Sequence, residues 1–381
     1  MLLAAIVLTH VTLIHVATGD VTRDTTLTVE SATDQTIDAH GAFVMPALWD
    51  MHVHLPDDNA GRDYLKLFVA NGVTGLRVME GSPELYRWRD AIERGAMFGP
   101  RMVVASAIID GPKSFFPDGE VVKVSNAEEA RRAVRGAKRD GADFIKVYDN
   151  LSRESYGAII DEARRVKLPV EGHVPFAMSV ADVSRAGQIT IEHMMGIAAA
   201  GERVFPLLRK NGTWECPTLI MRHNYAYLDD AALGTDPRLK YVRASTRDRW
   251  RKMIGEGNDE RKATFAREKA LAGEMARAGV GILAGTDNGN PFVYPGFSIH
   301  DELALLVDAG LTPLQALQAA TINAERVLRR TAGDWIVLDA NPLDDIHNTT
   351  RIRAVIIRGK FLDRQALDAL LLDAQTALAS D

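Results

Sequence analysis

Eight short apolar segments, separated by helical patterns, constrain the fold of this 381-residue chain more than any other feature. The segments are the one that ends at His54, followed by 72–78, 101–105, 142–148, 169–174, 189–194, 213–219 and 280–287. Strands and helices that alternate on this scale are typical of parallel βα units, and eight such units can close a barrel. We therefore expect an α/β fold built on a (β/α)8 TIM barrel.

Four of these segments carry one metal-binding or chargeable side chain near the C-terminal end, where a core strand should have none. These side chains are Lys146, His173, His193 and Asp287. In a (β/α)8 barrel the C-terminal ends of the strands converge on one cavity. The pattern therefore predicts that the four side chains share a site.

His52 and His54 stand two residues apart in the first segment. Residues i and i+2 of a strand point to the same face, so an extended His-x-His directs two imidazoles at one point. Taken alone, the pair fits two surface histidines just as well. The four later side chains favour a shared metal site over that alternative.

The amino-acid composition argues against nucleic-acid binding and against a disulfide-stabilised fold. The chain is 46% hydrophobic and 25% charged with a net charge of −6, and it has no basic tail, so we expect no nucleic-acid partner. The single cysteine, Cys216, excludes an intrachain disulfide and is expected to be a buried, inert thiol.

The N-terminal residues 1–8 are apolar but too few to span a bilayer, and no Lys or Arg precedes Arg23. A first β-strand is therefore the favoured interpretation, with no membrane partner and a cytoplasmic location. Export would be the alternative if a leader had been removed.

Both ends of the chain have β-like patterns, at 12–14 and 27–29 and again at 335–338 and 354–357. We expect residues 1–46 and 336–381 to form a small β-sandwich domain, the second part with a C-terminal helix. The barrel would then occupy residues 47–335.

One connection, residues 221–280, is unusually long and is expected to hold about two amphipathic helices beside the mouth of the barrel. Within 238–277 there are 12 Lys and Arg against 6 Asp and Glu. This excess fits a solvated helical face, or a lid that attracts anionic substrates.

The combination of motifs resembles the amidohydrolase superfamily, specifically its dinuclear-metal members of the imidazolonepropionase-like and prolidase types. The resemblance covers nearly the whole chain. Its motifs are Trp49–His54, Phe144–Tyr148, Gly172–Pro175, Ile191–His193, Gly285–Asp287 and the helix Leu311–Thr321. The chain departs from the family pattern at Ala47, where Pro-Gly is usual, and in a shortened terminal sheet.

The resemblance implies two divalent metal ions, with zinc expected. His52, His54 and Asp287 would hold the first ion, His173 and His193 the second, and Lys146 would bridge both as a CO2-derived carbamate. An unmodified lysine is cationic near neutral pH and would repel the ions, whereas a carbamate is an anionic oxygen ligand. The alternative is an interior ion pair between Lys146 and Asp287 without metal.

The ligand set implies hydrolysis of an amide bond by a metal-bridging hydroxide, with Asp287 as the catalytic base that passes the proton to the leaving nitrogen. The expected substrate is a dipeptide or an N-acyl amino acid with a free carboxylate, and the enzyme is expected to be a homo-oligomer. Tyr148 and His223 are candidate substrate-binding residues. A core tyrosine and an exposed loop histidine are the respective alternatives.

Other functions remain open. A lactam, lactone or other carboxylic ester hydrolase would use the same site. A mononuclear deaminase is less favoured, because Phe176 stands where such enzymes carry Glu and because Lys146 would be unnecessary. A catalytically inactive structural relative would typically lack ligands, and none of the six is missing here.

Overall fold

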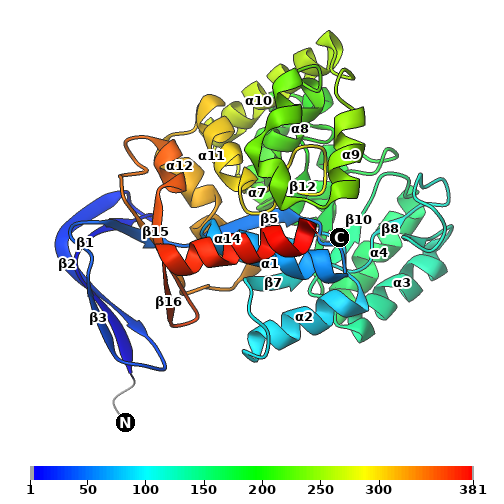
Figure 1. Cartoon of the computed structure of the whole chain (residues 1–381). Helices are drawn as coiled ribbons and strands as arrows, with labels where there is room; N and C mark the ends of the chain where they lie inside the picture. The colour runs from blue at the N-terminus through cyan, green and yellow to red at the C-terminus, as the bar shows by residue number, and fades with distance from the viewer. Residues whose placement is uncertain (1–3, 380–381) are drawn as a thin grey trace.

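The computed structural model describes residues 4–379 and has a mixed α/β architecture, which confirms the predicted class (Figure 1). A sheet made from both ends of the chain lies at one side, and parallel strands and helices form the remainder. The expected first strand begins at Ala5. Residues 1–3 and 380–381 of the predicted terminal segments lie outside the described residues.

The terminal sheet joins the two ends of the chain through β4 and β14, which pair antiparallel with Val44 opposite Val337. Its apolar face buries side chains from both ends, including Ile6 and Ile356. The two ends therefore build one sheet, as predicted, whereas a second sheet packed on it as a sandwich stays a prediction. The strand order is β16 (Lys360–Asp363), β15 (Ile352–Ile357), β14 (Trp335–Leu338), β4 (Phe43–Pro46), β1 (Ala5–His15) and β2 (Asp20–Glu30), with β3 (Gln35–Asp38) on β1.

The middle of the chain holds parallel strands in two groups. The first group is β5 (Leu48–Val53), β6 (Val73–Val78) and β7 (Arg101–Val104). The second is β13 (Trp214–Cys216), β12 (Thr190–Glu192), β11 (Val170–Gly172), β10 (Ile145–Val147), β8 (Ile109–Asp110) and β9 (Val122–Lys123). An isolated bridge between Ala105 and Phe144 connects the two groups. Seven of the eight predicted segments thus contain a strand.

The eighth predicted segment, 280–287, forms no continuous strand and instead makes single bridges at its two ends. Ile282 pairs with Glu215 of β13, and Asn288, directly after the segment, pairs with Val53 of β5. Gly281 explains part of the difference, because a Cβ atom there would lie 2.1 Å from the Trp214 ring. Glycine permits this close approach but weakens a strand.

Helices separate the parallel strands, and several of them begin and end where the sequence provides caps. Helix α3 is an example: Asn126 caps its N-terminus, acidic residues occupy the first turn, and Gly141 ends it in the left-handed conformation. The helices between strands are α1 (Asn59–Ala70), α2 (Pro83–Glu93), α3 (Ala127–Asp140), α4 (Arg153–Val166), α5 (Val180–Ala186), α6 (Ile197–Ala200) and α7 (Phe205–Asn211).

The long connection after β13 contains three α-helices and two short 3-10 helices, more than the two helices predicted. They are α8 (Leu219–Ala226), the 3-10 turns Ala231–Thr235 and Pro237–Tyr241, α9 (Ala244–Lys252) and α10 (Asp259–Arg277). Arg243 ties this segment to Asp58 at the start of α1 through a 2.9 Å ion pair. The basic segment is thus anchored to the body of the protein.

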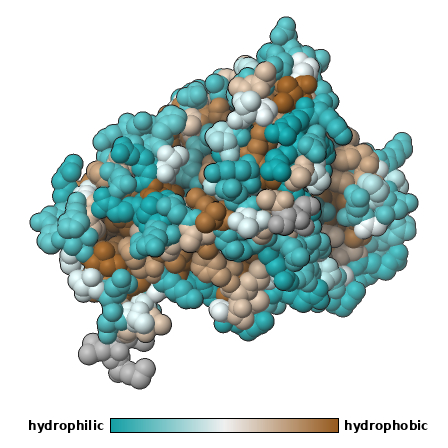
Figure 2. Space-filling model, viewed as in Figure 1, coloured by the Kyte–Doolittle hydropathy of each residue, from teal (hydrophilic) through white to brown (hydrophobic). Residues whose placement is uncertain are grey.

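The remaining helices are α11 (Ser298–Asp308), α12 (Pro313–Ala319), α13 (Ile322–Leu328) and α14 (Arg364–Ala379). Helix α14 packs along α1 (Figure 1), with Leu367 and Leu378 fully buried. Figure 2 shows hydrophilic residues over most of one face, with hydrophobic residues in separate smaller groups. Among residues 4–379, no helix is both long enough and apolar enough to cross a membrane.

Candidate active site

A cavity of about 820 Å³ lies at the C-terminal ends of the parallel strands. Its lining includes side chains that follow or end β10, β11 and β12, as the sequence pattern predicts. Six of the predicted site residues line it: His54, Lys146, Tyr148, His173, His193 and Asp287. The seventh, His52, is fully buried beside them.

His52 and His54 come from the end of β5, and their ring centroids lie 5.4 Å apart. Nδ1 of His52 lies 2.8 Å from a carboxylate oxygen of Glu192, and Nδ1 of His54 lies 3.4 Å from Glu80. These contacts fix each ring by one nitrogen and leave Nε2 for another partner. Asn288 accepts a 3.1 Å hydrogen bond from the amide of His54 and donates one of 3.0 Å to its carbonyl.

The Nε2 atom of His52 is buried and has no hydrogen-bond partner among the described residues. It lies 3.6 Å from Oδ1 of Asp287, and Nε2 of His54 lies 3.3 Å from the same oxygen. One ligand atom from each of these three residues falls within 4.8 Å of the others. Two imidazole nitrogens and a carboxylate at such distances fit a divalent cation.

His173 and His193 follow β11 and β12 directly, and their rings meet edge to face with centroids 4.9 Å apart. Nδ1 of His173 lies 2.8 Å from Asp149, and Nδ1 of His193 lies 2.7 Å from the hydroxyl of Thr218. Burial lowers the pKa of His173 to about 4 and lowers that of His193 well below its usual value. Both rings are therefore neutral near pH 7, the state in which imidazole binds metals.

Lys146 lies in β10 and is only 1% exposed. Its Nζ makes no ion pair within 4.0 Å among residues 4–379, so the alternative of an interior pair with Asp287 is not found. Burial lowers the pKa of the amine, while Glu192 and Asp287 oppose this shift. A buried lysine without an acidic partner is costly, and modification of the amine would relieve that cost.

Asp287 stands between the two pairs of histidines. Its backbone amide donates a 2.7 Å hydrogen bond to the carbonyl of His52, and its φ of 58° places it in the left-handed region. Its Oδ2 lies 3.8 Å from Nδ1 of His193. Burial raises the pKa of this carboxyl, as expected for a group able to carry a proton.

A network of buried charged side chains holds one of the histidines, His52, and it was not predicted from the sequence. Arg77 of β6 is fully buried and donates to Glu171 at 2.5 Å and to Glu192 at 2.9 Å. It also donates to the hydroxyl of Thr190 at 2.8 Å. Glu192 also contacts Nδ1 of His52, so the network fixes the orientation of a predicted metal ligand. The local signal was the position of Arg77, Glu171 and Glu192 within the apolar segments 72–78, 169–174 and 189–194.

Asp50 is a second buried support that the sequence reasoning missed. Its side chain accepts hydrogen bonds from the amide of His52 at 3.2 Å and from the amide and hydroxyl of Thr286 at 2.9 and 2.6 Å. Burial raises its pKa to about 7. Asp50 thus joins the end of β5 to the segment that carries Asp287.

The two predicted substrate-binding residues lie in different surroundings. Tyr148 lines the cavity and stacks on His173, with ring centroids 4.0 Å apart. His223 lies on α8 against Tyr227 and Phe265, outside the residues that line the cavity. A role of His223 in substrate binding therefore stays a prediction.

The helical wall of the cavity contains polar residues that sequence reasoning missed. Arg222 and Tyr225 of α8 and Glu268 of α10 line the same cavity. Cys216, by contrast, is fully buried, and burial raises the pKa of its thiol well above the usual value. The thiol is therefore protonated, in agreement with the inert role expected for it.

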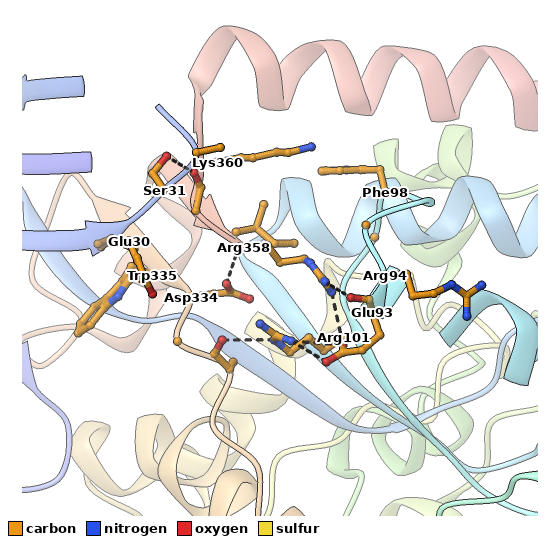
Figure 3. Close-up of a pocket in the computed structure, with 18 of the residues that line it drawn as sticks. Glu30, Ser31, Glu93, Arg94, Phe98, Arg101, Asp334, Trp335, Arg358 and Lys360 are labelled. Carbon is orange, nitrogen blue, oxygen red and sulfur yellow. Dashed lines mark hydrogen bonds and ion pairs between the residues drawn. The ribbon is translucent and has the colours of Figure 1, made fainter. Parts of the chain in front are cut away.

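A larger cavity of about 920 Å³ lies between the terminal sheet and the rest of the chain (Figure 3). Its lining includes Arg101 and Arg358, which both pair with Glu93, and Asp334, which accepts a 2.7 Å hydrogen bond from the amide of Arg358. It contains no histidine and none of the six predicted ligands. The cavity of about 820 Å³ is therefore the better candidate for the active site, although it is the smaller of the two.

The chain is similar to known proteins over most of its length. Ochratoxinase from Aspergillus niger is 26% identical over 370 residues, which covers 80% of this chain and 71% of ochratoxinase. The structure of bottromycin amidohydrolase has a TM-score of 0.83 and 27% identity, and covers 98% of this chain and 90% of its own. A putative prolidase from Bifidobacterium longum has a TM-score of 0.73 and 25% identity, with 98% and 99% coverage.

The sequence profile of the amidohydrolase family matches residues 43–362. This range is most of the chain, and it includes the four histidines, the lysine and the aspartate that meet at the strand ends. It leaves out the first three strands of the terminal sheet and the whole of α14. The predicted resemblance is thereby confirmed, and the chain belongs to the amidohydrolase family.

Proposed function

We propose that this protein is a metal-dependent hydrolase that cleaves an amide bond in a small molecule, namely a dipeptide or an N-acyl amino acid. The observation that carries the proposal is the partnerless, buried Nε2 of His52, close to Asp287 and to three further histidines. Burying polar side chains without partners lowers the stability of a folded protein unless the cluster binds a ligand.

The proposal includes a (β/α)8 barrel over residues 47–335, flanked by a β-sandwich domain from 1–46 and 336–381. The bridges at Ala105, Ile282 and Asn288 support it, because they connect the edges of the two parallel groups in the order that a closed barrel requires. The likeness to the solved amidohydrolase structures supports it further.

The residues that would hold two divalent cations, with zinc expected, are His52, His54, Lys146 as a carbamate, His173, His193 and Asp287. When bound there, the cations would acidify a water molecule and polarise the carbonyl of the scissile amide. Neutral His173 and His193, together with the buried Asp287, give a donor set that suits this role.

The chain's own residues would orient the site and move the proton. Glu192, Asp149 and Thr218 hold one nitrogen of each of three histidine rings. Asp287 would accept a proton at its carboxylate and pass it to the leaving nitrogen. Tyr148 lines the same cavity beside His173, so its hydroxyl is the candidate donor to the oxygen that becomes negative in the transition state.

A hydrolysis screen tests the proposal. Protein loaded with zinc and bicarbonate would be assayed on dipeptides, N-acyl amino acids, lactams and lactones. We expect turnover of amides that carry a free carboxylate. Exclusive turnover of lactones or release of ammonia from an amino-substituted ring would refute the amide assignment. The homo-oligomeric state and the cytoplasmic location stay predictions, the first to be tested by light scattering.

A further inference from the structure

An ion pair between two helices of the long connection lines part of the cavity that also contains the metal-site residues. Arg222 of α8 donates through Nε to Oε2 of Glu268 at 2.8 Å and through Nη2 to Oε1 at 2.7 Å. Glu268 on α10 is only 6% exposed, whereas one third of the Arg222 side chain is exposed. The carboxylate is therefore an internal anchor, and the guanidinium is the part that meets the cavity.

The geometry of the pair leaves one edge of the guanidinium open. Glu268 occupies the edge formed by Nε and Nη2, and among residues 4–379 no hydrogen bond or ion pair to Nη1 is found. A guanidinium can serve two carboxylates on two edges, because its five N–H groups form a planar fork. Glu268 fixes the plane of that fork in advance, which reduces the entropy lost on binding.

Arg222 is the one arginine among the residues that line this cavity, and the other lysine or arginine is Lys146, at the metal site. The nearby carboxylates already face histidines: Glu80 contacts His54, and Asp287 lies between the imidazoles. An anionic group of a substrate would therefore be attracted to Arg222 rather than repelled across the cavity.

Apolar side chains occupy much of the remaining wall. They include Met194, Met195 and Met221, together with Phe115 and Phe116, which stack with ring centroids 4.3 Å apart. Methionine and aromatic walls accept bulky apolar groups of varied shape. The cavity thus combines an apolar enclosure with one fixed guanidinium.

We propose that Arg222, held by Glu268, binds the carboxylate of an N-acyl amino acid with an apolar side chain, and so determines substrate specificity. This inference rests on the proposed function, because it assumes that the substrate amide reaches the metal-site residues. A second cavity of about 580 Å³ shares Met221, Arg222 and Tyr225 with the first, so the carboxylate site lies where the two spaces adjoin.

Equilibrium binding tests the inference independently of turnover. The Asp287→Asn protein, loaded with zinc, would be titrated by calorimetry with N-acetyl-L-phenylalanine and with N-acetyl-L-phenylalaninamide, which differ only in the carboxylate. We expect the acid to bind at least about 10-fold more tightly than the carboxamide, as for a hydrogen bond between charged groups. Arg222→Met should remove this preference and leave the affinity for the carboxamide within about 3-fold.

Matched variants distinguish carboxylate recognition by Arg222 from a purely structural role of this residue. Arg222→Lys should retain part of the preference because it keeps the charge. Arg261→Met changes an exposed arginine that lines only the second cavity, and it should leave the preference intact. Arg222→Gln serves as the substitute if the methionine variant does not fold.

The inference is overturned if the parent protein binds neither probe, if Arg222→Met keeps the preference, or if it weakens both probes equally. An Arg222-dependent preference without hydrolysis of any amide would uphold the carboxylate site and refute the proposed function. Amide hydrolysis combined with a carboxylate preference that does not depend on Arg222 would uphold the proposed function and refute the carboxylate site. The two failures are therefore distinguishable.

Discussion

The backbone amide of Asp287 donates a 2.7 Å hydrogen bond to the carbonyl of His52, and this bond connects the last predicted ligand to the first. The side-chain oxygen Oδ1 of Asp287 then lies 3.6 Å from Nε2 of the same histidine. Residues 235 positions apart in sequence are thus fixed by backbone geometry rather than by side-chain contacts alone. The position of Asp287 is set before any ligand binds.

Asp287→Asn should retain most of the bound metal but lose amide hydrolysis. Asparagine keeps one oxygen ligand but cannot accept and return a proton, so kcat should fall roughly 10²- to 10⁴-fold. Elemental analysis and initial rates on the same preparation would measure both quantities. Full activity in this variant would refute the proton-transfer role.

Arg77→Met should destabilise the protein by about 3–5 kcal/mol, because it leaves the buried carboxylates of Glu171 and Glu192 without their cation. Urea denaturation would measure the change in the free energy of unfolding. Arg87→Met is the matched control: this arginine pairs with Glu84, but its side chain is 71% exposed, so the loss should be much smaller. Equal losses in the two variants would contradict the importance of the buried network.

Glu302 should make stability fall as the pH rises. Its carboxyl on α11 accepts a 2.7 Å hydrogen bond from the amide of Ile220, and burial raises its pKa from 4.5 to about 8, with Asp50 and Asp301 acting in the same direction. The folded state therefore binds more protons than the unfolded state between these values. The stabilisation is complete below about pH 4.5 and is lost as the pH approaches 8, by at most about 5 kcal/mol.

Glu302→Gln removes this titration while keeping the shape of the side chain. The difference in unfolding free energy between pH 5.5 and pH 8.5 should shrink in the variant, as measured by urea denaturation at both pH values. Asp308→Asn, at an exposed position on the same helix, should leave the difference unchanged. An unchanged difference in Glu302→Gln would show that the carboxyl is ionised in the folded protein at both pH values.

The sequence predicted which side chains share the cavity because each of them leaves a local signal, and their role as metal ligands stays a prediction. Lys146, His173 and His193 interrupt short apolar segments near their C-terminal ends, where the strands of a (β/α)8 barrel converge. The structure brings these residues into one cavity, together with His54 and Asp287. Period-2 alternation and strand-end position were therefore sufficient to identify candidate residues.

The contacts of the supporting residues could not be predicted in the same way. Arg77, Glu171 and Glu192 also interrupt apolar segments, but Arg77 contacts the two carboxylates across 94 and 115 residues, and the sequence does not show which charges pair. The pair of Arg222 and Glu268 depends on how α8 and α10 pack, which helical periodicity does not determine. The same limit applies to the segment 280–287, where glycines replace strand pairing with close packing.

The most direct test of the account is an electron-density map at Lys146 from crystals soaked with zinc and bicarbonate. The account predicts a carbamate on Nζ that bridges two metal ions, with His52, His54 and Asp287 at one ion and His173 and His193 at the other. A bare amine at Lys146 with no metal density among these histidines would contradict it.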